Sequence, residues 1–332
     1  MTGAAPITES DDIVSSALKT HRYLRLSLVF LIATLFVGVI VASWDPLDLD
    51  WQVLPSISHY FYTPVRLIFV SVLVAASLAL LALSGRRRPS TFLDIAAIFA
   101  PLIAIIPTGL EPPAEKVERD RMTCVATNCI PTAELASLRA TVATYVVAVI
   151  MVVVTLYFIR KRKHVATSTA HRVVSWVAVI TAVGLAALAF LPEVGDGFPF
   201  RFWPVDTVHF AAVLLFFGSF AAVPIIYGWR PPEPDETPPT GWQKGVYRFV
   251  AIAMGADLLF LVFVFVARKF NWDLFGEAPV VLIGEAVALF LFAWFWWEQT
   301  FQRWDDQFNP FVVTASTALG AITPAEEPAE AE

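Results

Sequence analysis

A polar stretch, LPSISHYFYTPVR at residues 54–66, lies between the first two long apolar segments of this chain. It combines serine, histidine, tyrosine and arginine side chains, which can act as nucleophiles, bases and anion-binding groups. Two interpretations are open: a solvated loop between helices, or the polar rim of a site. The choice depends on what the neighbouring segments bring to the same place.

Two carboxylates lie well inside apolar segments, Asp257 in VAIAMGADLLFLVFVFV and Glu285 in PVVLIGEAVALFLFAWFWW. Ionisable side chains at membrane depth are costly and usually face the interior of a helix bundle or a water-filled cavity. A short loop joins the two segments, so antiparallel packing would place both carboxylates at similar depth in one cavity if both faces turn inward. The alternative is a neutral, hydrogen-bonded carboxyl that holds helices together.

Further polar residues are expected near the outer boundary of the membrane. Asp206 and His209, in WPVDTVHF, share one helix face at spacing i, i+3. We therefore predict one outward-facing ligand site, formed by Ser56, Ser58, His59, Tyr62, Arg66, Thr108, Asp206, His209, Asp257 and Glu285. In the competing interpretation, Asp206 and His209 only complete a helix start, Arg66 reaches the lipid headgroups, and the aromatic residues 60–62 form an interfacial belt.

The apolar residues occur in blocks that indicate a membrane protein. The chain of 332 residues is 57% hydrophobic and only 16% charged, whereas a soluble domain carries roughly a quarter charged residues. Eight segments have the roughly 20 apolar residues that a membrane span needs, and each must be a helix because lipid offers no hydrogen-bond partner. We predict an all-α polytopic transmembrane bundle of about eight helices at 23–43, 64–84, 91–110, 136–159, 171–191, 206–228, 245–267 and 277–298.

The basic residues predict the orientation. With both termini in the cytoplasm, the basic runs GRRRP and RKRKH both face inward, as the positive-inside rule requires. Residues 1–22 then form a cytoplasmic segment before a retained first helix, 23–298 the bundle, and 299–332 an acidic, largely disordered tail. We predict a location in the bacterial plasma membrane.

The two cysteines, Cys124 and Cys129, lie in a loop assigned to the outside. A disulfide there would close a tight hairpin in an oxidising compartment, and free thiols are the alternative. No cofactor is predicted, although His59, His209 and Glu285 offer three ligands for a zinc ion. The chain has no basic, aromatic-interleaved patch, so the expected partners are the membrane and a lipid or small amphipathic ligand rather than nucleic acid. The oligomeric state is left open.

Three stretches resemble a known group of proteins. LPSISHYFYTPVRLIFV is similar to a signature of uncharacterised bacterial multi-pass membrane proteins: SIS, one residue, two aromatic residues, one further residue and Thr. VHFAAVLLFFGSFA and IGEAVALFLFAWFWW resemble a later helix and the last helix of that group. More distantly, the Ser-Ile-Ser turn is similar to that of the damage-regulated autophagy modulators and related six-helix proteins.

The resemblance implies a six-helix fold to which the segments 136–159 and 171–191 are an addition. It also implies one shared site, and it implies no reaction. Phe61 stands where tyrosine is more usual in the group. The residues that the resemblance assigns to the site are Ser56, Ser58, His59, Tyr62, Arg66, His209 and Glu285.

Three functions remain open. In the first, the protein binds or moves a small anionic or lipid-like molecule: Arg66 and His59 recognise an anionic head, and Glu285 with Asp257 accepts a cation or proton. In the second, it is an intramembrane lipid hydrolase or transferase, possibly zinc-dependent, in which Ser56 or Ser58 is the nucleophile. His59 or His209 would be its base, and Glu285 or Asp206 would orient that base. In the third, it is a non-catalytic assembly factor.

Overall fold

The computed structural model describes residues 9–45, 50–85, 89–125, 128–163, 168–191, 197–200, 207–232, 237–270, 272, 274–276 and 278–304. Within these residues it contains ten helices, of which eight have at least seven residues, so the predicted all-α fold is confirmed. The long helices are α1 (Glu9–Ser43), α2 (Arg66–Leu83), α3 (Ser90–Ile105), α5 (Glu134–Lys163), α6 (Thr169–Phe190), α7 (Val208–Trp229), α8 (Gly241–Lys269) and α9 (Val280–Gln302).

The short elements all lie in connections. They are the 3₁₀ helix η1 (Ile57–Tyr62), the helix α4 (Lys116–Arg119) and two antiparallel strand pairs, β1 (Trp44–Asp45) with β2 (Asp50–Trp51) and β3 (Met122–Val125) with β4 (Asn128–Pro131).

Seven of the long helices in the described part are long and apolar enough to cross a membrane, and α3 is apolar but shorter. The chain is therefore a multi-pass membrane protein. The predicted span 91–110 was too long, because α3 ends at Ile105. Ile106 is extended (φ −97°, ψ 101°) and precedes Pro107, and a residue before proline disfavours the helical conformation. Thr108 consequently lies in an extended segment after the helix.

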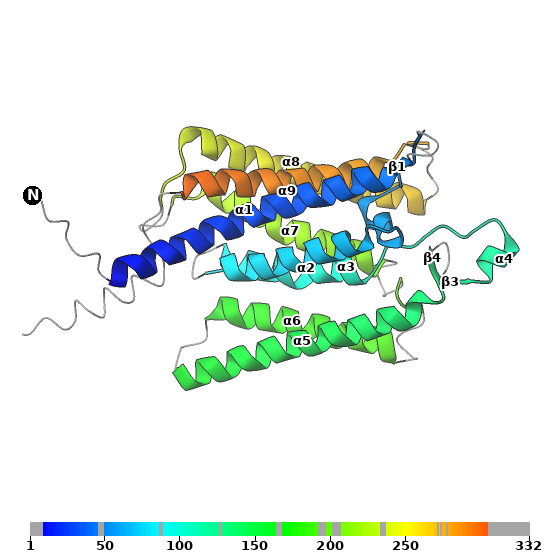
Figure 1. Cartoon of the computed structure of the whole chain (residues 1–332), viewed down its shortest axis with the longest axis horizontal. Helices are drawn as coiled ribbons and strands as arrows, with labels where there is room; N and C mark the ends of the chain where they lie inside the picture. The colour runs from blue at the N-terminus through cyan, green and yellow to red at the C-terminus, as the bar shows by residue number, and fades with distance from the viewer. Residues whose placement is uncertain are drawn as a thin grey trace, which may run out of the picture.

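Six helices form a closed ring, in which each helix packs against two neighbours in the order α1, α2, α3, α7, α8, α9 and back to α1. The start of α1 and the end of α9 lie at one end, which we call the terminal end, and η1 with the β3–β4 hairpin lies at the other, the η1 end (Figure 1). The terminal end is the one predicted to face the cytoplasm.

Aromatic side chains fill the middle of the ring. Phe220 of α7 lies 4.6 Å from Phe292 and 5.3 Å from Phe295 of α9, measured between ring centroids. All three side chains are at most 1% exposed. We call these three residues the aromatic core. They lie at mid-length of α7 and α9, between the polar groups at the two ends of the bundle.

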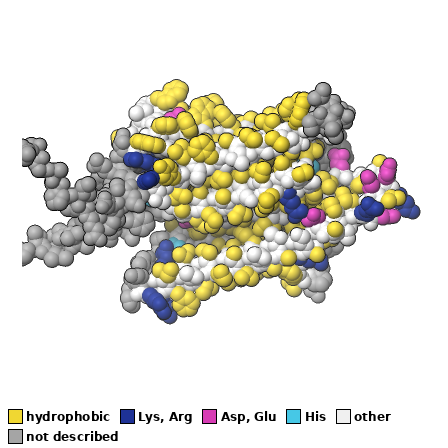
Figure 2. All heavy atoms as spheres, in the orientation of Figure 1, with side chains coloured by type: hydrophobic (Ala, Val, Ile, Leu, Met, Phe, Trp, Pro, Cys, Tyr) yellow, Lys and Arg dark blue, Asp and Glu magenta, His cyan; other side chains and the backbone are white. Residues whose placement is uncertain are grey.

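Helices α5 and α6 pack against each other and lie beside the ring, which they contact through α3 (Figure 1). The hydroxyl of Tyr145 in α5 donates to the carbonyl of Ile98 in α3 at 2.8 Å. Hydrophobic side chains cover the long sides of the molecule, and charged side chains gather toward its two ends (Figure 2). That distribution is expected of a surface in contact with lipid.

Gly284 marks a close approach of α8 and α9 that can be tested. A Cβ atom there would lie 2.6 Å from Cδ2 and 3.0 Å from Cγ of Leu261, a side chain only 3% exposed. We expect Gly284→Ala to lower the free energy of unfolding by about 1–3 kcal/mol, as overpacking does in cores. Gly255→Ala is the matched control: that helical glycine faces open space, so it should be neutral or stabilising. Equal effects in detergent unfolding of the two variants would contradict the assigned packing.

Candidate functional site

The stretch at residues 54–66 contains a packed 3₁₀ helix rather than an open loop. Ser56 caps η1, because its side chain accepts a hydrogen bond from the backbone N–H of His59 at 3.3 Å. Tyr60 is fully buried and its hydroxyl is hydrogen-bonded to Ser43 at the end of α1. Phe61 is only 4% exposed. Burial of Tyr60 and Phe61 shows that the interfacial-belt interpretation was wrong for these two residues.

Glu285 of α9 holds the first turn of η1. Its Oε2 accepts the backbone N–H of Ile57 at 2.5 Å and that of Ser58 at 3.4 Å, while its Oε1 accepts the Ser58 hydroxyl at 3.0 Å. The first N–H groups of a helix have no partner within the helix, and their dipoles favour a negative charge. The carboxylate therefore completes η1, and the backbone bond from Leu282 N–H to the Pro55 carbonyl (3.1 Å) supports the same contact.

Ser58 connects Glu285 to His209 of α7. The Ser58 Oγ lies 2.8 Å from His209 Nε2, and His209 Nδ1 lies 2.5 Å from the carbonyl oxygen of Ile106. Ser58 and His209 are 4% and 7% exposed. The result is a continuous chain, Glu285–Ser58–His209, that joins α9, η1 and α7 to the end of α3. We call it the relay.

The relay fits one shared proton between Glu285 and His209. A carbonyl oxygen only accepts, so His209 Nδ1 must carry a hydrogen toward Ile106. The Ser58 hydroxyl has one hydrogen, which it gives either to Glu285 or to His209 Nε2. In the first case His209 is an imidazolium facing a carboxylate, and in the second both are neutral. Both arrangements satisfy every contact with the same heavy-atom positions, so a proton can cross without rearrangement of the backbone.

His59 lies beside the relay but points to a different segment. Its Nδ1 is 2.6 Å from Ser56 Oγ, and its ring is hydrogen-bonded to the backbone of Gly109. Burial lowers the pKa of His59 to about 4, the positive charge of Arg268 acts in the same direction, and the bond to Gly109 opposes the shift. His59 is consequently neutral at pH 7.

Arg66 and Tyr62 tie η1 to the same side of the bundle. The Tyr62 hydroxyl donates to the Thr108 carbonyl at 2.8 Å, so Thr108 takes part through its backbone. Burial and the nearby Glu134 carboxylate raise the pKa of Tyr62 above its usual value. Arg66 Nη1 lies 2.9 Å from Glu134 Oε1, and the guanidinium lies 4.0 Å from the ring centroid of Phe61. Glu134 was not among the predicted site residues.

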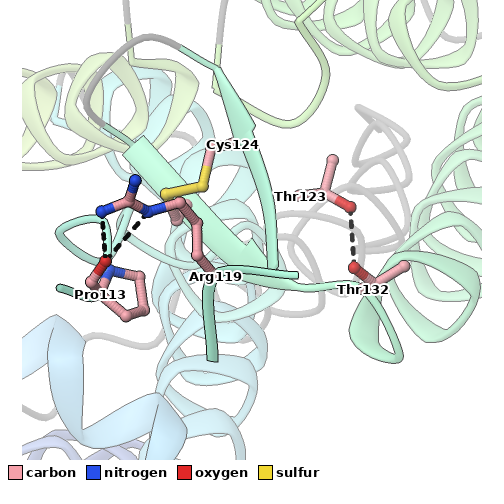
Figure 3. Close-up of a disulfide and its surroundings, with 6 residues drawn as sticks. Pro113, Arg119, Thr123, Cys124 and Thr132 are labelled. Carbon is pink, nitrogen blue, oxygen red and sulfur yellow. Dashed lines mark hydrogen bonds between the residues drawn. A yellow bond between two sulfur atoms is a disulfide. The ribbon is translucent and has the colours of Figure 1, made fainter. Parts of the chain in front are cut away.

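A disulfide hairpin packs against the segment that η1 contacts. The Cys124 and Cys129 sulfur atoms are 1.98 Å apart, which confirms the predicted disulfide. Cys129 of β4 exchanges both backbone hydrogen bonds with Leu110, at 2.8 and 2.9 Å. A Cβ at Gly109 would lie 2.6 Å from that of Asn128, so only glycine permits this approach. Beside the disulfide, the Arg119 guanidinium donates to the Pro113 carbonyl and Thr123 is hydrogen-bonded to Thr132 (Figure 3).

One predicted site residue within the described part, Asp257, is not part of this network. Asp257 lies on α8 against Gly284, where its Oδ1 would be 3.4 Å from an added Cβ, and its Oδ2 is buried without a hydrogen-bond partner among the described residues. Glu285 turns toward η1, and no hydrogen bond joins the two carboxylates within the described residues. Asp206 lies outside the described residues.

The zinc hypothesis finds no ligand set in this arrangement. Both ring nitrogens of His209 are used, one by the Ile106 carbonyl and one by Ser58. Glu285 is likewise turned to η1 by its three hydrogen bonds. Over the described ranges, no three His, Cys, Asp or Glu side chains are grouped as metal ligands.

A second polar network, missed by the sequence analysis, lies at the terminal end. The Tyr247 hydroxyl donates to Gln302 Oε1 at 2.5 Å, Gln299 Nε2 donates to the Tyr247 hydroxyl at 3.2 Å, and Gln302 Nε2 donates to the Thr237 carbonyl at 2.8 Å. Gln299 and Gln302 are 2% and 6% exposed. Their spacing in EQTFQ was the available signal, but residues from 299 onward were assigned to the tail, whereas α9 continues to Gln302.

The lowered pKa of His59 predicts a pH-dependent stability. A folded pKa of about 4 against 6.5 means that the unfolded chain binds more protons between these values, so stability falls as the pH drops through that range. Between pH 7.5 and 5 the loss should be about 2 kcal/mol. His59→Gln keeps one acceptor and one donor without a charge, and its unfolding in mixed detergent micelles should lose this part of the pH dependence. An unchanged pH profile would contradict the assignment.

No family model, curated protein or solved structure matches this chain. Its own helices show a multi-pass membrane protein. The functional hypotheses therefore depend on the contacts described above.

Proposed function

We propose that this protein binds or moves a small anionic or lipid-like molecule at its η1 end, and that the protonation of the relay controls opening there. The observation that carries the proposal is the set of three hydrogen bonds that Glu285 accepts from η1. One side chain of α9 holds the backbone N–H groups of Ile57 and Ser58 and the Ser58 hydroxyl, across 227 or more residues of sequence.

Burying an ionisable group to hold a loop costs desolvation free energy. A carboxylate removed from water is costly unless every acceptor position is satisfied, and apolar packing would hold a static loop equally well. A carboxylate differs from apolar packing in one respect: its acceptor strength depends on whether it carries a proton. Charge-assisted bonds to Ile57 and Ser58 weaken when Glu285 is protonated. Docking of η1 is thereby coupled to the proton that Glu285 shares with His209.

Polar contacts and an apolar layer follow one another along the bundle. The relay lies at the η1 end, the aromatic core joins α7 and α9 at mid-length, and the Tyr247–Gln299–Gln302 network lies at the terminal end. Glu285 and Gln299 are 14 positions apart on α9, which places the two polar layers about 21 Å apart along the helix. Passage of a molecule requires each layer to open, and two hydrogen-bonded layers separated by an apolar one support alternating opening of the two ends.

The recognition of an anion is supported by the pair of Arg66 and Glu134. Both side chains are part-exposed, 39% and 29%, and exposed ion pairs contribute little net stability. A phosphate or carboxylate of a ligand has the same chemistry as the Glu134 carboxylate, so it can replace Glu134 on Arg66 at small cost. The stacking of the guanidinium on Phe61 keeps Arg66 in position during such an exchange.

The family resemblance supports the same site. Its three stretches contribute Ser58, His209 and Glu285, the three members of the relay. They also belong to η1 and the six-helix ring, and α5 with α6 lies outside that ring. We propose that the ring with its relay is the part shared with that group of proteins.

Hydrogen exchange of η1 tests the proposal. In the purified full-length His59→Gln protein, which lacks the pH dependence of His59, protection of the amides at residues 56–62, corrected for intrinsic exchange, should be about tenfold lower at pH 5 than at pH 8, equivalent to roughly 1.4 kcal/mol. Glu285→Gln in the same background cannot change its charge, so its profile should be flat. Asp257→Asn in that background is the control, because Asp257 makes no bond to η1, and should behave as the parent protein. If Glu285→Gln retained the parent profile, the relay would be a static packing element and the assembly-factor function would be favoured.

One distance favours a second candidate, an intramembrane hydrolase. The 2.8 Å between Ser58 Oγ and His209 Nε2 is the separation of a nucleophile and its base. The order of groups differs from that of a hydrolase triad, however, because serine here lies between histidine and carboxylate, and the Ile106 carbonyl orients the histidine. The Ser58 hydroxyl is also shared with Glu285 and enclosed.

A fluorophosphonate probe distinguishes the two candidates. We expect no labelling of Ser58 in the detergent-purified protein, because a serine only 4% exposed and bonded on both sides cannot reach the phosphorus atom. Stoichiometric labelling that disappears in Ser58→Ala but persists in Ser56→Ala would support the hydrolase. Intact-protein mass spectrometry provides the readout.

A further inference from the structure

Helix α5 packs against the ring along only half of its length. Leu138, Val142 and Tyr145, in the half nearer the η1 end, are buried. In the half nearer the terminal end, from Val147 to Arg162, no side chain is fully buried. Val149 packs against the core in part, and nine large apolar side chains are more than 40% exposed. Those exposed side chains are Val147, Ile150, Met151, Val152, Val154, Leu156, Tyr157, Phe158 and Ile159.

The space beside this half of α5 is a hollow on the face of the molecule. Figure 2 shows it between the α5–α6 pair and the α2–α3 part of the ring, with hydrophobic side chains along it. On the ring side, α2 exposes Val74, Leu78 and Leu81 to 38%, 63% and 41%. Since apolar walls at membrane depth are filled by apolar matter, acyl chains fit this hollow.

Basic side chains lie at the terminal end of the hollow, where α5 ends and α6 begins (Figure 2). Arg160, Lys161 and Arg162 end α5, and Arg172 lies in the first turn of α6. Arg160 lies near α3 and α6, since its charge acts on Asp94 and on His171. No carboxylate lies within 4 Å of these four basic groups over the described ranges.

We propose that this hollow is a binding site for an anionic phospholipid, whose acyl chains lie against α5 and α2 and whose phosphate is bound by Arg160 and Arg172. The basic groups exceed the single nearby carboxylate, Asp94, so the net charge at the end of the hollow is positive. Guanidinium groups bind phosphate through paired, charge-assisted hydrogen bonds. Basic groups between helices at the cytoplasmic side are the expected binding partners of anionic headgroups.

A lipid also explains why α5 and α6 are not packed more closely onto the ring. Without an occupant, apolar residues on both walls would gain contacts by closing the hollow. With acyl chains in the hollow, the half of α5 nearer the terminal end stays apart from α2 and α3. The other half of α5 is anchored to α3 through Tyr145. The lipid is in this sense a structural part of the interface between the six-helix ring and the α5–α6 pair, at a place distinct from the relay.

Lipid-dependent thermal stability of the full-length protein in dodecyl maltoside tests the site. Dioleoyl phosphatidylglycerol should raise the melting temperature, and dioleoyl phosphatidylcholine should raise it much less. The apparent affinity for phosphatidylglycerol should fall about tenfold in Arg160→Gln/Arg172→Gln. The matched control is Lys19→Gln/Lys244→Gln, which removes two basic groups at the terminal end of the ring and should retain the wild-type response. Arg160→Lys/Arg172→Lys should recover part of the affinity.

Four outcomes would overturn the proposal. Equal stabilisation by the two lipids would show that the headgroup charge is not recognised. An equal loss of phosphatidylglycerol affinity in Arg160→Gln/Arg172→Gln and in Lys19→Gln/Lys244→Gln would show that only the overall positive charge matters. Full stabilisation by glycerol 3-phosphate would identify a soluble anion as the ligand. A lipid-independent dimer that dissociates in the arginine variant would show that a second copy of the chain occupies the hollow. If Arg160→Gln/Arg172→Gln does not fold, two measurements still decide. They are the comparison of the two lipids on the wild type and the phosphatidylglycerol affinity of Arg160→Lys/Arg172→Lys.

Discussion

The contact on which the η1 end depends is the carboxylate of Glu285 at the first turn of η1. It supplies the partners that two backbone N–H groups of a short helix need, at a depth where water supplies few. Because η1 is fixed there, Ser58 reaches His209, Tyr60 reaches Ser43, and Tyr62 reaches the Thr108 carbonyl. One side chain of the last helix thus positions a stretch that follows the first helix, and it joins the two sides of the ring.

The carbonyls that complete this arrangement come from the broken end of α3. Ile106 is extended because it precedes Pro107, so its carbonyl is not used within the helix and is available to His209. Thr108 and Gly109 follow in the same segment and accept bonds from Tyr62 and His59, and β4 holds Leu110 from the other side. The disulfide hairpin therefore stabilises the acceptors of the site rather than its charged groups.

The sequence predicted the features that the lipid bilayer imposes, namely the helices and the need of buried polar groups for partners. Eight apolar segments became eight long helices, because a single segment in lipid can satisfy its backbone internally only as a helix. Ser58, His209 and Glu285 were identified because polar groups at membrane depth require partners. The partners themselves were predicted less well: Glu134 on Arg66 and the Ile106 carbonyl on His209 depend on how helices distant in sequence are oriented. Gln299 and Gln302 were missed because uncharged amides at the end of a helix resemble a solvated tail until their burial is known.

The two ends of the bundle and the outer surface of α5 follow one physical rule: each group needs a partner of its own polarity. At the η1 end an ionisable group replaces water for η1, and at the terminal end two glutamines and Tyr247 satisfy one another. Along α5 no side chain is fully buried over sixteen residues, from Val147 to Arg162, although α5 packs against α6, and the exposed apolar side chains face the membrane. In the proposed function, the charge of Glu285 couples the docking of η1 to the proton. In the proposed lipid site, Arg160 and Arg172 couple the α5–α6 pair to the composition of the bilayer.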